Sequence, residues 1–121
     1  MCSAGDCQNY RQATRDVLRL LASLDQQLAY ARDVPIADVP AELVCIWFDD
    51  LYHPESALFR ASFSESEARR LAEFHAFFEA RVKRIPDTLE QMHRCQAWLE
   101  VVAEARRVLD DLGWTEAEAR H

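Results

Sequence analysis

The chain has 121 residues, of which 50% are hydrophobic and 29% are charged, and its formal net charge is −7. A chain of this length and composition can bury one hydrophobic core, so we expect a single folded domain covering residues 1–121. Only two glycines occur, which leaves no material for the glycine-rich loops that hold phosphates in nucleotide-binding proteins. The negative charge argues against a nucleic-acid partner, because phosphate contacts need clustered Lys and Arg.

The longest apolar run covers only residues 43–48, whereas a membrane-spanning helix needs roughly 20 apolar residues. The first residues of the chain contain no basic segment that leads into an apolar stretch, so the sequence shows no secretion signal. These features predict a cytoplasmic protein that does not bind membranes.

The four cysteines lack the CxxC spacing of many metal and redox sites. We expect free thiols in a reducing compartment, with a disulfide or metal clip between Cys2 and Cys7 as the alternative. Cys45 and Cys95 lie in apolar stretches and are predicted to be small core residues.

The first predicted helix covers residues 8–32, where apolar positions recur at spacings of four and three. Such a long and narrow stripe fits the seam of a helical bundle and equally the seam of a homodimer, so both interpretations stay open. The stripe consists of Tyr10, Thr14, Val17, Leu21, Leu24, Leu28 and Ala31.

The second predicted helix covers residues 40–52. Asp38 followed by Pro40 is typical of a helix start, and Pro54 ends the segment. Residues 54–63 are expected to form a connector to the next helix.

The third and fourth predicted helices cover residues 65–84 and 88–112. Ser64 with Glu67 has the spacing of a capping box, and so has Asp87 with Glu90. Gly113 is suited to end the fourth helix, and Trp114 is expected to fold back on that end.

The sequence therefore predicts an all-α bundle of about four helices, with short flexible ends at 1–7 and 115–121. The break between the third and fourth helices is short, so we expect these two to be antiparallel neighbours.

The acidic residues are concentrated in two blocks, with a net charge of −5 over residues 35–66 and −4 over residues 87–121. Asp49 and Asp50 lie near the end of the second predicted helix, where acids oppose the helix dipole at a cost of about 0.3 to 1 kcal/mol each. Adjacent helical residues diverge by about 100°, so these two carboxylates are poorly placed to act as an acid and base pair. The two carboxylates either stabilise the fold, as a helix cap or in an ion pair, or take part in docking a partner.

We take the docking interpretation as the leading hypothesis, because aromatic residues adjoin the acids and interfaces commonly place aromatic anchors inside a charged rim. The candidate partner-binding residues are Trp47, Asp49, Asp50, Tyr52, His53 and Glu55. The partner would be a protein with a basic surface.

Two carboxylate and histidine pairs, Asp50 with His53 and Glu90 with His93, have the i, i+3 spacing that di-iron bundles use. We expect the pairs at different ends of the bundle, and His75 as a half-buried, hydrogen-bonded residue. No catalytic residue, metal ligand or cofactor is predicted. A metal-binding or enzymatic bundle that uses His53, His75 or His93 is the alternative, and a self-associating helical protein is a third.

The chain also resembles small acidic helical proteins of bacterial genomes in residues 45–54 (CIWFDDLYHP), 63–67 (FSESE) and 77–79 (FFE). Some proteins of this kind are immunity proteins of polymorphic or contact-dependent toxins. The resemblance, over residues 40–112, implies an acidic surface that covers a basic toxin active site.

Overall fold

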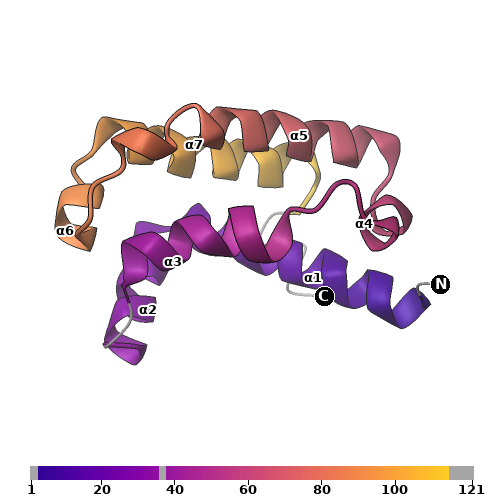
Figure 1. Ribbon diagram of the computed structural model, residues 1–121, viewed down its shortest axis with the longest axis horizontal. Helices are drawn as coiled ribbons and strands as arrows, with labels where there is room; N and C mark the ends of the chain where they lie inside the picture. The colour runs from indigo at the N-terminus through magenta and orange to yellow at the C-terminus, as the bar shows by residue number, and fades with distance from the viewer. Residues whose placement is uncertain (1–2, 36–37, 115–121) are drawn as a thin grey trace.

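A computed structural model describes residues 3–35 and 38–114 (Figure 1). Within these ranges the chain is helical and contains no strand, so the predicted all-α class is confirmed. The elements are α1 (Ala4–Leu21), α2 (Leu24–Asp33), α3 (Val39–Cys45), the π-helix η1 (Ile46–Leu51), α4 (Ala57–Ser62), α5 (Glu65–Glu79), the 3₁₀ turn η2 (Val82–Arg84), α6 (Leu89–Met92) and α7 (Gln96–Asp111).

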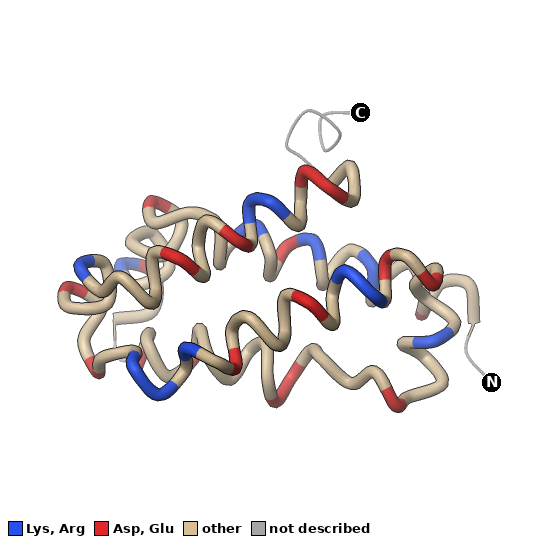
Figure 2. Tube along the Cα trace, turned by 90° about the horizontal axis from the view of Figure 1, so that it is seen from above, with Lys and Arg blue, Asp and Glu red and all other residues tan. Residues whose placement is uncertain are grey.

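The longest helices, α1, α5 and α7, form the body of the molecule. Helix α7 packs against both α1 and α5, while α4 and η1 also contact α1 (Figure 1). The short elements α6 and α2 pack around α3 at one end, and α4 lies at the other. Acidic and basic positions occur along both long sides (Figure 2).

The predicted first helix is wrong in its start and in its continuity. Helix α1 begins at Ala4 because Ser3 and Asp6 form a capping box, so residues 4–7 are helical rather than part of a flexible end. The helix then breaks at Ala22, and α2 starts with Ser23 as its cap, whose hydroxyl accepts from the Gln26 amide. Residues 115–121, the other expected flexible end, lie outside the described residues.

The second predicted helix starts as expected, because the Asp38 side chain accepts from the Ala41 amide and Pro40 stands in the first turn. It then changes to a π-helix, which the sequence did not predict. The Tyr52 amide donates to the Trp47 carbonyl, five residues earlier, at 2.9 Å. Single π turns of this kind occur frequently at functional sites.

The predicted connector contains helix α4, which Ser56 caps through the Phe59 amide. The capping box of Ser64 and Glu67 is confirmed, and Glu67 also forms a bidentate ion pair with Arg11 of α1. This carboxylate therefore fixes the start of α5 against α1. Helix α5 ends at Glu79, five residues before the predicted end.

The predicted box of Asp87 and Glu90 is wrong, because Thr88 caps α6 by accepting from the Gln91 amide. The predicted fourth helix is also divided into α6 and α7. Its end is confirmed: Gly113 has φ +72°, and the following Trp114 donates its amide to the Leu109 carbonyl and is 2% exposed.

The core is aromatic and aliphatic, and all three tryptophans belong to it. Within the described residues, no helix combines the length and hydropathy that crossing a membrane requires. The largest fully buried side chains include Trp47, Trp98, Phe74, Phe78, Leu18, Leu21, Leu43, Leu71 and Met92.

Most of the apolar stripe of the first predicted helix is covered by the same chain. Val17 and Leu21 are buried in the core, and Tyr10 packs against Phe59 and Phe63 of the α4 region. The stripe is thus mainly a seam within the molecule.

Gln27 is a fully buried polar residue whose amide is satisfied on both sides. Its nitrogen donates to the Leu20 and Leu21 carbonyls at the end of α1, at 3.1 and 3.2 Å. Its oxygen accepts from the Trp98 indole at 3.1 Å and lies 2.8 Å from His93 Nε2. One side chain therefore joins α1, α2, the end of α6 and α7.

We predict that Gln27→Ala lowers stability by roughly 3 kcal/mol or more, because each buried donor or acceptor left without a partner costs about 1 to 3 kcal/mol. Thermal melting would then shift by on the order of 10 °C. The neighbouring Gln26 has an exposed side chain, so Gln26→Ala is the matched control and should change stability by less than about 0.5 kcal/mol. Equal melting temperatures for the two variants would contradict the role of Gln27.

We also predict that acid weakens the fold through His93. Burial lowers the pKa of His93 below its ordinary 6.5, so the folded state favours the neutral imidazole. The contribution of the neutral His93 to the free energy of unfolding is present above pH 6.5 and is lost as the pH falls through the lowered pKa. Melting temperatures of wild type and His93→Gln, measured between about pH 8 and pH 5, should show a smaller loss in the variant. Parallel curves would refute this.

Candidate functional site

A groove of about 690 Å³ lies between the first half of α1 and the segment that joins η1 to α4. One face of α1 forms one wall, because residues 6, 9, 10 and 13 project from the same side of a helix. The end of η1 and the following connector form the other wall. The lining residues are Asp6, Asn9, Tyr10, Ala13, Asp50, Leu51, His53, Glu55, Ser56 and Leu58.

The groove combines an apolar floor with a negative rim. The apolar lining residues include Tyr10, Leu51 and Leu58, whereas Asp6, Asp50 and Glu55 supply carboxylates. No Lys or Arg is among the lining residues within the described part of the chain. Such a groove attracts a cationic group and offers its carbon stem an apolar surface.

Tyr10 holds the two walls together. Its hydroxyl donates to the Leu51 carbonyl at 2.5 Å, at the last residue of the π-helix. Burial raises the pKa of the Tyr10 phenol, and the nearby negative charge of Glu55 acts in the same direction. The phenol therefore stays protonated near neutral pH and remains a donor to this carbonyl.

His53 lies in the groove wall and is oriented by its neighbours. Its Nε2 is 2.8 Å from the Asp49 carbonyl oxygen, and its Nδ1 is 3.6 Å from Glu55. The contact with a carbonyl oxygen requires a proton on Nε2. The imidazole is consequently held by the backbone on one side and faces a carboxylate on the other.

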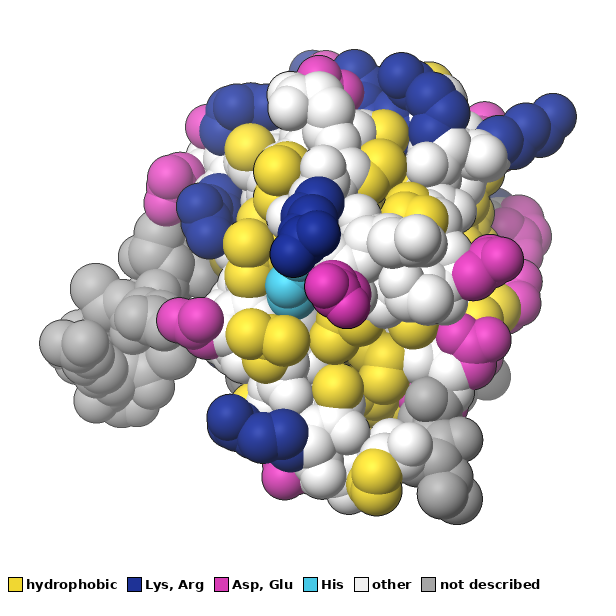
Figure 3. All heavy atoms as spheres, turned by 90° about the vertical axis from the view of Figure 1, so that its left-hand side faces the viewer, with side chains coloured by type: hydrophobic (Ala, Val, Ile, Leu, Met, Phe, Trp, Pro, Cys, Tyr) yellow, Lys and Arg dark blue, Asp and Glu magenta, His cyan; other side chains and the backbone are white. Residues whose placement is uncertain are grey.

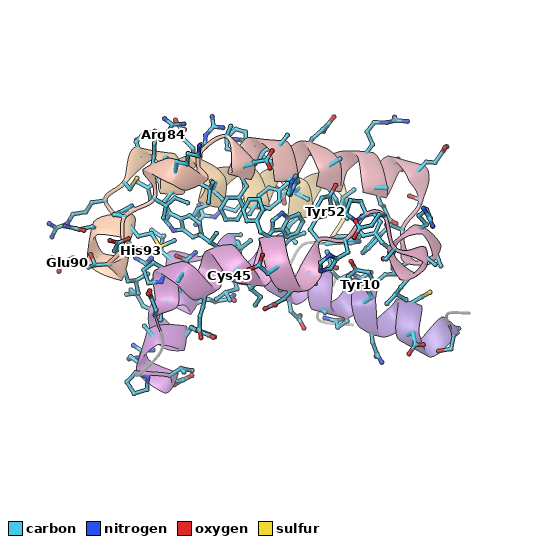
Figure 4. The ribbon with its side chains drawn as sticks, viewed as in Figure 1. Tyr10, Cys45, Tyr52, Arg84, Glu90 and His93 are labelled. Carbon is cyan, nitrogen blue, oxygen red and sulfur yellow. The ribbon has the colours of Figure 1, made fainter. Side chains whose placement is uncertain are left out.

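Trp47 and Tyr52 do not lie on the surface in the way that the docking hypothesis expected. Trp47 is fully buried and donates its indole N–H to His75 Nδ1 at 3.2 Å. It therefore packs inside the protein, and its side chain is not exposed to a partner. The half-buried Tyr52 stacks on the Trp47 ring at 5.1 Å and on the His75 ring at 4.5 Å. Figure 4 shows Tyr52 and Tyr10 near each other.

Asp49 is exposed and lies outside the groove, beside the thiol of Cys45. Cys45 is exposed too, so its predicted place in the core is wrong: on α3 it lies away from the buried Leu43 and Trp47. A hydrogen bond with Asp49, followed by smaller effects of desolvation and nearby acids, raises the pKa of this thiol. Cys95 is half-buried, and the alternative of a disulfide or metal clip between Cys2 and Cys7 involves Cys2, which lies outside the described residues.

The three histidines of the alternative hypothesis occupy separate environments. His53 lines the groove, His75 accepts from the Trp47 indole as a half-buried residue, and His93 contacts Gln27. Within residues 3–35 and 38–114, no group of three or more His, Cys, Asp or Glu side chains could hold a metal ion.

Of the six candidate residues, the structure brings Asp50, His53 and Glu55 together in one groove. Sequence reasoning missed the wall from α1, including Asp6 and Asn9. Their spacing from Tyr10 placed them on one helical face, but this pattern did not reveal that α1 crosses the end of η1.

Comparison of the chain with protein-family models, with curated proteins and with solved structures found no match.

We predict that Tyr10→Phe destabilises the protein by about 1 kcal/mol, because it removes the hydrogen bond to Leu51 and keeps the packed ring. Tyr30→Phe is the matched control, since the Tyr30 hydroxyl donates to Glu42 at an exposed site where water can replace it. Chemical denaturation measures both variants. If Tyr10→Phe unfolds at the same denaturant concentration as Tyr30→Phe, the hydrogen bond does not hold the groove together.

Proposed function

We propose that this protein is a small acidic helical binding protein, of the immunity or inhibitor type, that docks a basic protein partner in the groove between α1 and η1. The observation that carries the proposal is the apolar floor bordered by Asp6, Asp50 and Glu55, with no cation among its lining residues in the described part of the chain. Complementary charge speeds the encounter of two proteins and orients them.

The local structure supports a binding role for this surface. Asp50 stands in the last turn of a helical segment, where its charge opposes the helix dipole and costs some stability. Within the described residues, neither Asp49 nor Asp50 forms an ion pair within 4 Å, so a salt bridge to the third predicted helix does not account for them. Asp50, which lines the groove without an ion-pair partner among the described residues, remains available to a partner.

The groove also provides anchoring surface beside the charges. A Lys or Arg side chain could lay its carbon stem on Tyr10 and Leu51 and bring its charged end to Asp50 or Glu55. The buried Trp47, its half-buried hydrogen-bond partner His75 and the stacked Tyr52 support the wall behind these acids. A rigid wall reduces the entropy cost of association.

We also propose that the groove is carried by a bundle of four helical segments, in which α5 and α7 run antiparallel. Contacts of α7 with α1 and with α5, and the turn formed by η2 and α6 between α5 and α7, support this description.

The test compares wild type with the double variant Asp50→Asn, Glu55→Gln. We expect its stability to stay within about 0.5 kcal/mol, because both side chains are exposed at the surface. Association with the partner should slow by about tenfold at low salt, and the rates should converge at high salt, since screening acts over about 8 Å at physiological ionic strength. Stopped-flow mixing or surface plasmon resonance measures the rates.

Asp110→Asn serves as the control, because Asp110 is exposed on α7 and does not line the groove. The partner is first isolated from the native host with wild type, the groove variant and the control as parallel baits. A genuine partner is retained by wild type and Asp110→Asn and reduced with the groove variant. An on-rate at low salt that is the same for all three proteins would reject the groove as the docking site.

A further inference from the structure

A second surface lies at the far end of the molecule from the groove, where α2, α3, η2 and α6 meet. Figure 4 shows Arg84, Glu90 and His93 at this end, away from Tyr10. Figure 3 faces this end and shows hydrophobic side chains spread across it, with basic, acidic and histidine side chains near the middle and further charged groups of both signs around the edge.

This end is hollowed between α2, α3, η2 and α6, and the hollows have both apolar and acidic lining residues. Two hollows, of about 270 and 370 Å³, share Asp38, Pro40 and Asp87 and so form one continuous depression. Its apolar walls include Ala31, Pro35, Val44, Val82, Ile85 and Leu89.

An exposed apolar strip on α2 adjoins this depression. Leu28 is 46% exposed and Val34 is 36% exposed, and they are the two exposed large hydrophobic residues of the described chain. Leu28 precedes Ala31 by three residues, so these two lie on one side of α2, and Val34 follows directly after the end of the helix. The apolar surface therefore extends from the hollows onto α2.

Charges of both signs surround the depression. Asp38 and Asp87 line it, while Lys83 and Arg84 stand beside it on η2. Within the described residues, none of these four side chains forms an ion pair within 4 Å. Lys83 and Arg84 would repel a strongly basic partner, and Asp38 and Asp87 would repel a strongly acidic one.

We propose that this end pairs with a second copy of the same chain across a two-fold axis, with Arg84 of each copy facing Asp87 of the other. A two-fold interface places the same patch on both sides, so a patch that contains both signs can complement itself. The apolar strip with Leu28 supplies the buried centre. This assignment does not rest on the proposed function, and it leaves both grooves open at the outer ends of the dimer.

Sedimentation or light scattering of the full chain, between about 1 and about 100 µM, tests the proposal. The mass should rise from 14.0 kDa toward twice that value with concentration. Leu28→Lys and Arg84→Glu should each weaken self-association by about tenfold or more. Arg60→Glu, an exposed change on α4 at the other end, should leave it unchanged. Circular dichroism confirms that each variant is folded.

A mixing experiment separates this arrangement from other dimers. Arg84→Glu and Asp87→Lys should each self-associate poorly. An equimolar mixture of the two should form heterodimers, because the carboxylate introduced at position 84 of one chain then faces the ammonium group introduced at position 87 of the other. A chain that stays monomeric at about 100 µM, or folded variants that dimerise as well as wild type, would overturn the proposal. So would a mixture that associates no better than its two components.

Discussion

The amide of Gln27 is the interaction on which the arrangement of the helices depends. The last carbonyls of a helix lack partners within it, and at the end of α1 the Leu20 carbonyl accepts from the Ser23 amide while the carbonyls of both Leu20 and Leu21 are within reach of the Gln27 side chain. Gln27, from the next helix, satisfies both and accepts from Trp98 of α7 in return. Since an unsatisfied group in the core is costly, this network allows α1 to stop and α2 to turn toward α3 and α6.

One side of the π-helix is buried in the core, and its end lines the groove. Trp47 must be buried against Phe74 and His75 of α5, while Leu51 must also reach the core. The π-helix ends at Leu51, and the Leu51 carbonyl accepts from the Tyr10 hydroxyl. The end of η1 is thereby joined to α1, and Asp50 and Glu55 are placed opposite Asp6. The acidic groove follows from how aromatic side chains fill the core.

Charge is distributed so that the two ends of the molecule differ. The groove end presents carboxylates around an apolar floor, whereas the α2 and α6 end presents both signs around an apolar depression. Between them, Arg11, Arg70 and Arg81 are used internally, in ion pairs with Glu67, Glu104 and Glu100. The body thus neutralises much of its own charge, and the surplus acids remain where a partner could use them.

Local chemistry let the sequence determine the helical class, the cap at Ser64, the start at Asp38 and the end at Gly113, because these depend on residues within one turn. From the sequence alone, Asp50, His53 and Glu55 were also predicted to be partner-binding residues. The predicted single helix missed the break at Ala22, where Ser23 caps α2 and where Gln27 meets Trp98 from the other end of the chain. The sequence also did not predict that Cys45 is exposed and Trp47 is buried. The π turn and the neighbouring helices decide which side chains of this segment point into the core. Contacts between distant residues, which no local pattern encodes, made one groove from two separate segments.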